Sequence, residues 1–140
     1  MPSGRAKRQL DPTSFEFFLD RGLGRYDVAE MLRSRGHVAH AMADVYPGGA
    51  DQMMDDPDWM HDVDDRGWVA LTKDASIVRA HRDELEASCL RMVSLDSSKL
   101  TGDQMAARFE FHLNRIIQRC NKPGPFFDVL HATNIERRYP

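Results

Sequence analysis

The feature that most constrains the fold is the alternation of short apolar runs with segments of helical periodicity. Apolar runs of strand length occur at residues 15–20, 37–42, 68–72, 90–95 and 126–130. Helical patterns lie between them, near residues 28–36, 56–66, 82–89 and 103–120. Alternating strands and helices favour right-handed β-α-β units, so we predict a three-layer α/β fold with a mainly parallel sheet flanked by helices. The run at 126–130, which follows Pro-Gly-Pro, is expected to be an edge strand.

The length of 140 residues suits one domain, and a chain of this size can bury about two-thirds of its surface. We expect residues 1–14 to be a flexible basic tail and residues 15–140 to form a single domain. No apolar run approaches the roughly 20 residues that span a bilayer, so we expect a cytoplasmic protein without a membrane partner. Cys89 and Cys120 form no CxxC pair, which argues against a disulfide scaffold or a zinc ribbon.

The charge of the chain is unevenly distributed. The formal net charge is −3, but residues 41–65 contain eight aspartates and no lysine or arginine. The other 115 residues therefore carry a net charge of +5. Such an acidic segment is either a solvated face or a cation site set in basic surroundings.

The positions of four aspartates favour the cation site. Ligands of parallel α/β sheets bind at the carboxyl ends of the strands. Asp20 ends the first predicted strand and Asp74 lies just past the third, whereas Asp56 and Asp58 open the helix that leads into the third. We therefore expect all four carboxylates at one edge. Taken singly, Asp56 before Pro57 also suits a helix N-cap, and Asp20 and Asp74 also suit turns.

Carboxylates held close together repel one another unless a cation neutralises them. Oxygen ligands without cysteine or paired histidine favour Mg²⁺ or Mn²⁺. Such ions can activate a water and stabilise the leaving oxygen in phosphodiester hydrolysis. The pattern thus predicts a magnesium or manganese site formed by Asp20, Asp56, Asp58 and Asp74.

Several basic residues follow the same predicted strand ends and are candidates for contacts to substrate phosphates. A solvated surface position is the alternative interpretation for each of them, and Lys73 is also placed to neutralise the acids. Trp59 could stack on bases or pack in the core, while Trp68 is expected in the core. The RNA-binding candidates are Arg21, Arg25, Lys73, Arg79 and Arg82.

Three segments together resemble the PIN-like nuclease family, particularly the VapC-type toxins of bacterial toxin–antitoxin pairs: FFLDRGLG, DDPDWM and GWVALTKDASI. Asp56 and Asp74 are eighteen residues apart, and Thr72-Lys73-Asp74 stands where the family has Thr-basic-Asp. The resemblance covers roughly residues 15–100. It implies a Mg²⁺-dependent endoribonuclease whose partners are an RNA substrate and an antitoxin. By position, Asp20, Asp56 and Asp74 match the family's catalytic acids, with Asp58 as a fourth metal ligand.

Two departures from the family pattern keep an alternative open. Arg21 and Gly22 follow Asp20 where many members have an acid, and no acid follows shortly after Asp74. The alternative is a catalytically inactive PIN-like module that binds RNA or protein. A signalling receiver domain fits poorly, because Thr72, Lys73 and Asp74 are consecutive and cannot end three separate strands. The sequence leaves a homodimer open.

Overall fold

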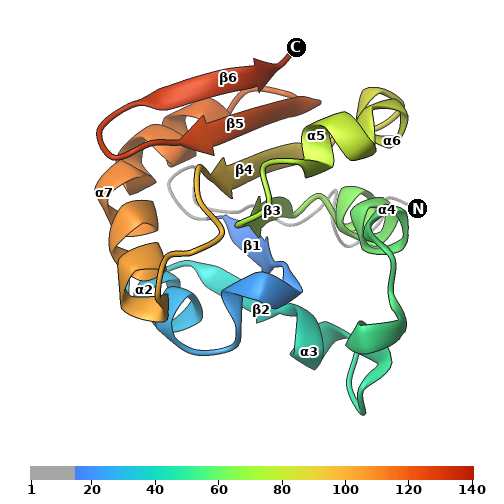
Figure 1. Cartoon of the computed structure of the whole chain (residues 1–140), viewed down its shortest axis with the longest axis horizontal. Coiled ribbons are helices and arrows are strands. Elements are labelled where there is room, and N and C mark those ends of the chain that lie inside the picture. The colour runs from blue at the N-terminus through green and yellow to red at the C-terminus, as the bar shows by residue number, and fades with distance from the viewer. Residues whose placement is uncertain (1–14) are drawn as a thin grey trace, which may run out of the picture.

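The computed structural model describes residues 15–140, so the predicted tail at 1–14 lies outside the described part. These residues form one sheet of six strands in the order β2-β1-β3-β4-β5-β6 (Figure 1). The strands are β1 (Glu16–Leu19), β2 (Val38–Ala41), β3 (Val69–Thr72), β4 (Arg91–Leu95), β5 (Phe126–Leu130) and β6 (Ile135–Tyr139).

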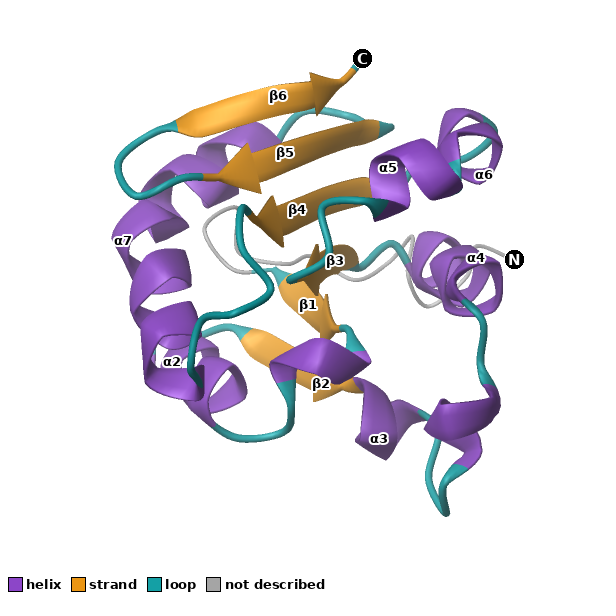
Figure 2. Ribbon diagram, in the orientation of Figure 1, coloured by secondary structure: helices purple, strands orange, loops and turns teal. Residues whose placement is uncertain are grey.

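Helices connect the strands and cover both faces of the sheet (Figure 2). The longer ones are α2 (Asp27–Ser34), α4 (Asp56–Arg66) and α7 (Gly102–Cys120). The shorter ones are α3 (Met42–Val45), α5 (Ile77–Ala80), α6 (Arg82–Glu86) and two 3-10 turns, η1 (Arg21–Leu23) and η2 (Ala50–Met53). None of the helices within residues 15–140 is long and apolar enough to cross a membrane.

The strand pairing confirms the predicted α/β class. Neighbouring strands from β2 to β5 are parallel, and only the β5–β6 pair is antiparallel. The prediction of an edge strand at 126–130 is wrong, because β5 lies between β4 and β6. The edge strand on this side of the sheet is β6, which has the sequence Ile-Glu-Arg-Arg-Tyr and is buried only at Tyr139. It lacks the apolar run by which the other strands were predicted.

Alternate side chains of the strands enter two separate cores. Phe17 and Leu19 face α2 and α7, whereas Phe18 faces α4 and stacks on Trp59 at 5.2 Å between ring centroids. Strands buried on both faces read as continuous apolar runs, since they have no solvent-facing side. Because β1, β3 and β4 are parallel neighbours, their carboxyl ends come together at one rim of this three-layer structure.

Two predicted helix limits need correction. The N-cap of α4 is Asp55 and not Asp56: Asp55 forms a capping box with Asp58, which fixes the helix start one residue earlier. The predicted helix over 82–89 is α6, which ends at Glu86 and is preceded by a separate short helix, α5.

Candidate functional site

The site is organised around the Thr72 hydroxyl, which is fully buried at the end of β3. Thr72 Oγ1 donates to Asp20 Oδ2 at 2.8 Å, and the Asp74 backbone N–H donates to Thr72 Oγ1 at 3.1 Å. The Asp20 N–H donates to the Leu71 carbonyl at 3.0 Å, which continues the β1–β3 pairing to the rim. One hydroxyl therefore connects the two strand-end aspartates that the sequence singled out.

Asp20 is held in an environment that disfavours its charge. Burial raises the pKa of its carboxyl, and the nearby negative charge of Asp56 raises it further. The hydrogen bonds from Thr72 and from the Arg21 backbone N–H, at 2.6 Å to Oδ1, act in the opposite direction. The net effect is a raised pKa, which a bound cation would reverse.

Asp56 lies at the first position of α4, and both its carboxylate oxygens have neighbours. Oδ1 accepts from Trp59 Nε1 at 3.0 Å, and Oδ2 lies 3.4 Å from His81 Nε2. Trp59 is almost fully buried against Phe18, so it is a core residue and does not offer its ring for stacking on bases.

Asp74 and Asp58 are used locally. Asp74 Oδ1 accepts from the Ser76 N–H at 3.0 Å and from the Ser76 hydroxyl at 2.5 Å, which closes a turn after β3. Asp58 Oδ2 accepts from the Asp55 N–H at 3.3 Å as part of the capping box. The structure therefore connects Asp20 with Asp74 and with Asp56, while Asp58 serves the helix start.

The donor chemistry of Asp20, Asp56 and Asp74 fits a hard divalent cation such as Mg²⁺. Within residues 15–140, however, no three histidine, cysteine, aspartate or glutamate side chains are close enough together to hold a metal ion. Each of the three carboxylates instead accepts a hydrogen bond from a protein side chain: Asp20 from Thr72, Asp56 from Trp59 and Asp74 from Ser76. Joint ligation of one ion therefore requires the three carboxylates to come closer together than they are in this structure.

The basic candidates fall into two groups. Arg21 is engaged, because its guanidinium donates to the carbonyl oxygens of Asp51 and Met54 in the acidic segment. Arg25 pairs with Asp44.

The other three basic candidates form no ion pair within the described chain. The Lys73 stem lies against Gly22, where an added Cβ would be 2.7 Å from Lys73 Cε. The Arg82 guanidinium lies over the Tyr139 ring at 5.0 Å. The Arg79 guanidinium has no hydrogen-bond or ion-pair partner among the described residues.

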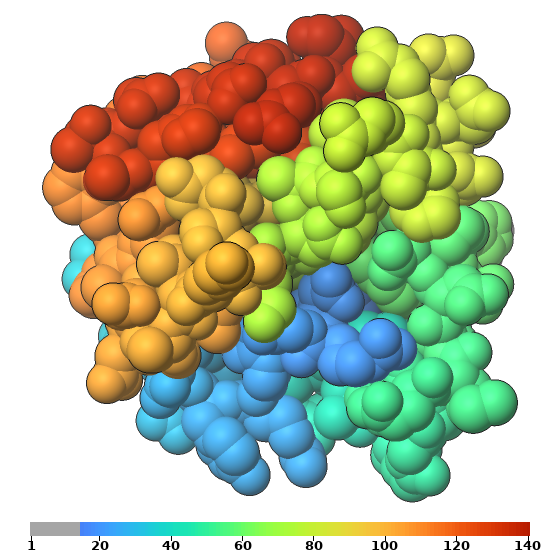
Figure 3. Space-filling model, viewed as in Figure 1, coloured from blue at the N-terminus to red at the C-terminus, as the bar shows by residue number. Residues whose placement is uncertain are grey.

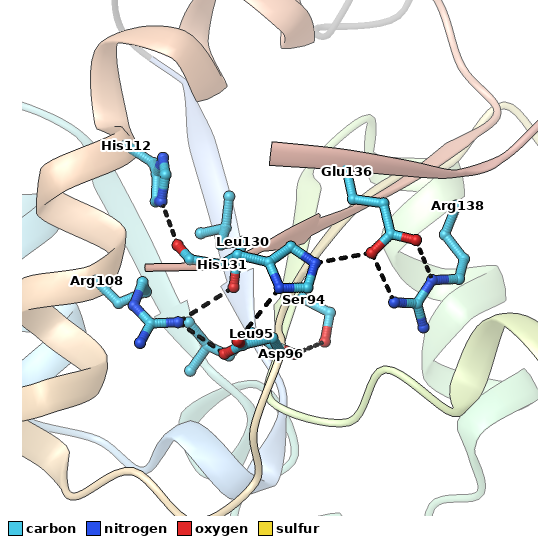
Figure 4. Close-up of polar contacts among 9 residues, drawn as sticks. All are labelled: Ser94, Leu95, Asp96, Arg108, His112, Leu130, His131, Glu136 and Arg138. Carbon is cyan, nitrogen blue, oxygen red and sulfur yellow. Dashed lines mark hydrogen bonds and ion pairs between the residues drawn. The ribbon is translucent and has the colours of Figure 1, made fainter. Parts of the chain in front are cut away.

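Sequence reasoning missed one carboxylate at the same rim, Asp96, which directly follows β4. Asp96 pairs with Arg108 at 2.7 Å and with His131 Nδ1 at 3.3 Å, and His131 Nε2 lies 2.7 Å from Glu136 (Figure 4). The strand-end rule that selected Asp20 and Asp74 would have selected Asp96 as well. Its carboxylate already contacts a guanidinium and an imidazole, so it stabilises the β5–β6 end of the rim.

Comparisons with known proteins agree with this architecture. Residues 15–97 match the family described as PIN like domain. The chain is 30% identical over 122 residues to a protein of Mycobacterium tuberculosis (strain ATCC 25618 / H37Rv) named "Putative ribonuclease VapC45", with 86% of this chain and 88% of that protein covered. No solved structure matches the chain significantly. The parallel sheet with acids at its carboxyl rim is thus that of a PIN-like domain, and the chain belongs to this family, among its VapC-type members.

Proposed function

We propose that this protein is a metal-dependent endoribonuclease. The observation that carries the proposal is the Asp20–Thr72–Asp74 connection, with Asp56 close enough to raise the pKa of Asp20. A partly buried carboxylate with a raised pKa beside a second carboxylate is typical of a functional site, because it costs stability without a structural return. The name of the mycobacterial relative supports ribonucleolytic chemistry.

In the proposed reaction Asp20, Asp56 and Asp74 hold Mg²⁺ or Mn²⁺. The ion would supply an activated water and stabilise charge on the leaving oxygen of the phosphodiester. Asp20 must be ionised to act as a ligand, and the Thr72 hydrogen bond favours that form. Lys73, beside the turn after β1, is placed to neutralise a substrate phosphate.

The proposal extends to the biological setting. The VapC-type resemblance supports a cytoplasmic toxin whose RNA cleavage is suppressed by an antitoxin protein. Expression of the chain alone should then arrest growth, and co-expression of a small protein encoded beside it should restore growth. Growth unaffected by strong expression would count against a toxin role, while leaving RNA cleavage to be tested separately.

RNA cleavage by the purified full chain tests the enzymatic proposal. We expect Asp20→Asn to abolish Mg²⁺-dependent cleavage of single-stranded RNA, since the amide keeps the size of the side chain but loses its charge. Asp65→Asn is the matched control, because Asp65 is exposed at the far end of α4 and, within residues 15–140, pairs only with His61. Wild-type activity in Asp20→Asn would refute the assignment. An inactive wild type that still binds RNA would favour the binding-module alternative.

A further inference from the structure

A cationic cavity adjoins the candidate site on the side of β6. It has a volume of about 400 Å³ and is lined by six residues: Ala75, Ser76, Val78, Arg79, Arg82 and Arg138. None of these six is a carboxylate, and three carry a guanidinium. In Figure 3 the yellow-green segment that follows β3 lies directly against the red strand β6, and the cavity is formed where the two segments meet.

The cavity is connected to the acids by one residue. Ser76 lines its wall, and the same Ser76 donates its N–H and its hydroxyl to Asp74 Oδ1. A ligand in the cavity therefore lies next to the turn that holds a proposed catalytic carboxylate. Three other cavities in the described part of the chain each contain an aspartate, and none of the three is lined by more than two arginines.

The guanidiniums of the cavity have unused capacity for an anion. Arg79 forms no ion pair or hydrogen bond with its side chain in the described chain, and Arg82 makes only a stacking contact with Tyr139. Arg138 donates to Glu136 through Nε at 3.2 Å and a terminal nitrogen at 2.9 Å, which leaves its other terminal nitrogen available. Guanidinium groups match phosphate oxygens in geometry and charge.

Resting on the proposed function, we propose that this cavity binds a phosphate of the RNA strand that flanks the bond to be cleaved. The apolar wall of Ala75 and Val78 then contacts the adjoining sugar, and the three arginines surround the phosphate. RNA would cross the rim from the Asp20–Thr72–Asp74 connection towards β6. Arg138 is thereby added to the RNA contacts, and Arg79 and Arg82 are selected over Arg21 and Arg25, which are engaged elsewhere.

Salt-dependent RNA binding tests the proposal. The background is Asp20→Asn, so that binding is measured without cleavage, and the probe is a fluorescent single-stranded RNA. Each lost phosphate contact lowers the slope of log K against log salt by about 0.7. Because the three arginines surround one phosphate, we expect the combined Arg79→Gln, Arg82→Gln and Arg138→Gln variant to bind RNA more weakly and to lose about 0.7 from that slope. Arg115→Gln, an exposed arginine of α7 without an ion pair in residues 15–140, should leave it unchanged.

Two further measurements separate failure of the cavity assignment from unfolding of the triple variant. Arg79→Gln removes a side chain that has no partner in residues 15–140, so this variant should fold even if the triple variant does not. It should weaken RNA binding and lower the slope by no more than about 0.7. RNA affinity and slope unchanged in both variants would overturn the cavity assignment. The second measurement uses an acidic peptide as an alternative anionic probe. If these variants lose binding of that peptide but keep the wild-type RNA affinity and slope, the cavity assignment is also overturned. Cleavage by wild-type protein is scored separately, so an inactive enzyme with the expected slopes would contradict only the proposed function.

Discussion

At the scale of single residues, the Thr72 hydroxyl acts on both strand-end aspartates. Its hydroxyl donates to the Asp20 carboxylate and accepts the backbone N–H of Asp74. The first bond favours the ionised form of Asp20, and the second fixes the start of the turn that carries Asp74. Thr72 contacts no substrate in this scheme and is a positioning residue.

Thr72→Val should move the acidic limb of the RNA-cleavage profile to higher pH. Burial already raises the pKa of Asp20, and removing the Thr72 hydrogen bond removes a contribution that lowers it. A larger fraction of Asp20 is then protonated at any given acidic pH, and protonated Asp20 cannot ligate a cation. The measurement is kcat/KM for RNA against pH.

Thr72→Ser is the control for that experiment, because serine keeps the hydroxyl and removes only a methyl group. Its acidic limb should stay near that of the wild type. A uniform loss of activity in Thr72→Val at every pH, without a shift of the limb, would show that Thr72 only holds the backbone.

Some of these residue roles could be predicted from the sequence, and others could not. Asp20 and Asp74 were found because strands of a parallel sheet end at one edge, whatever their side chains contact. The Thr72 bridge depends on the β1–β3 register, which no local pattern specifies. The partners of Arg21 and Arg25 lie in the acidic segment, up to 33 residues away in the sequence for Arg21 and 19 residues away for Arg25. These contacts also depend on the tertiary fold.

At the scale of elements, β5 and β6 are held together by a buried charge. Asp128 in β5 is 1% exposed and faces α7, where Arg119 Nε donates to Oδ2 at 2.6 Å. From β6, Arg137 Nε donates to Oδ1 at 2.5 Å. A carboxylate in a central strand is thus neutralised by one cation from a helix and another from the edge strand.

Asp128→Asn should destabilise the fold by about 3 kcal/mol, because it leaves two guanidiniums around a neutral group in a largely buried position. For a domain of this size that corresponds to a fall in Tm of roughly 10 °C. Thermal unfolding followed by circular dichroism measures it. Asp103→Asn, at the exposed start of α7, should lower Tm by no more than a few degrees. Equal effects of the two substitutions would mean that the Asp128 pairs contribute nothing beyond surface charge.

The composition of β6 explains why the sequence predicted the wrong strand at this edge of the sheet. Five strands were predicted because each has an apolar or nearly apolar sequence; β1, β3, β4 and β5 are largely buried on both faces, and β2 exposes Val38. β6 is stabilised by ion pairs and by Tyr139, and its charged residues read as a loop. The sequence likewise could not specify the N-cap of α4. Asp55 and Asp56 are both good N-cap residues, and only the geometry selects Asp55.

At the scale of the whole molecule, metal binding should raise the thermal stability of the folded protein. A ligand that binds only the folded state stabilises it by about 2.7 kcal/mol at a concentration 100 times its Kd. For this chain that is a rise in Tm of roughly 8 °C. We therefore expect Mn²⁺ to raise the Tm of the wild type in a concentration-dependent manner, measured by differential scanning fluorimetry.

Variants locate the bound ion in that experiment. Asp20→Asn and Asp74→Asn should abolish the Mn²⁺-dependent rise, and Asp65→Asn should retain it. The same rise in all of these variants would place the ion elsewhere on the protein and remove the support for a site at the rim.

The position of β6 in the chain has a consequence for synthesis on the ribosome. Every other described element is made before Ile135–Tyr139, and during that interval β5 is an uncovered strand edge with Asp128 paired only from α7. The nascent domain also lacks Arg138, and with it one wall of the proposed phosphate cavity. On the proposed assignment, a product truncated before β6 would therefore bind RNA more weakly than the complete domain, and its exposed β5 edge would pair more readily with strands of other chains.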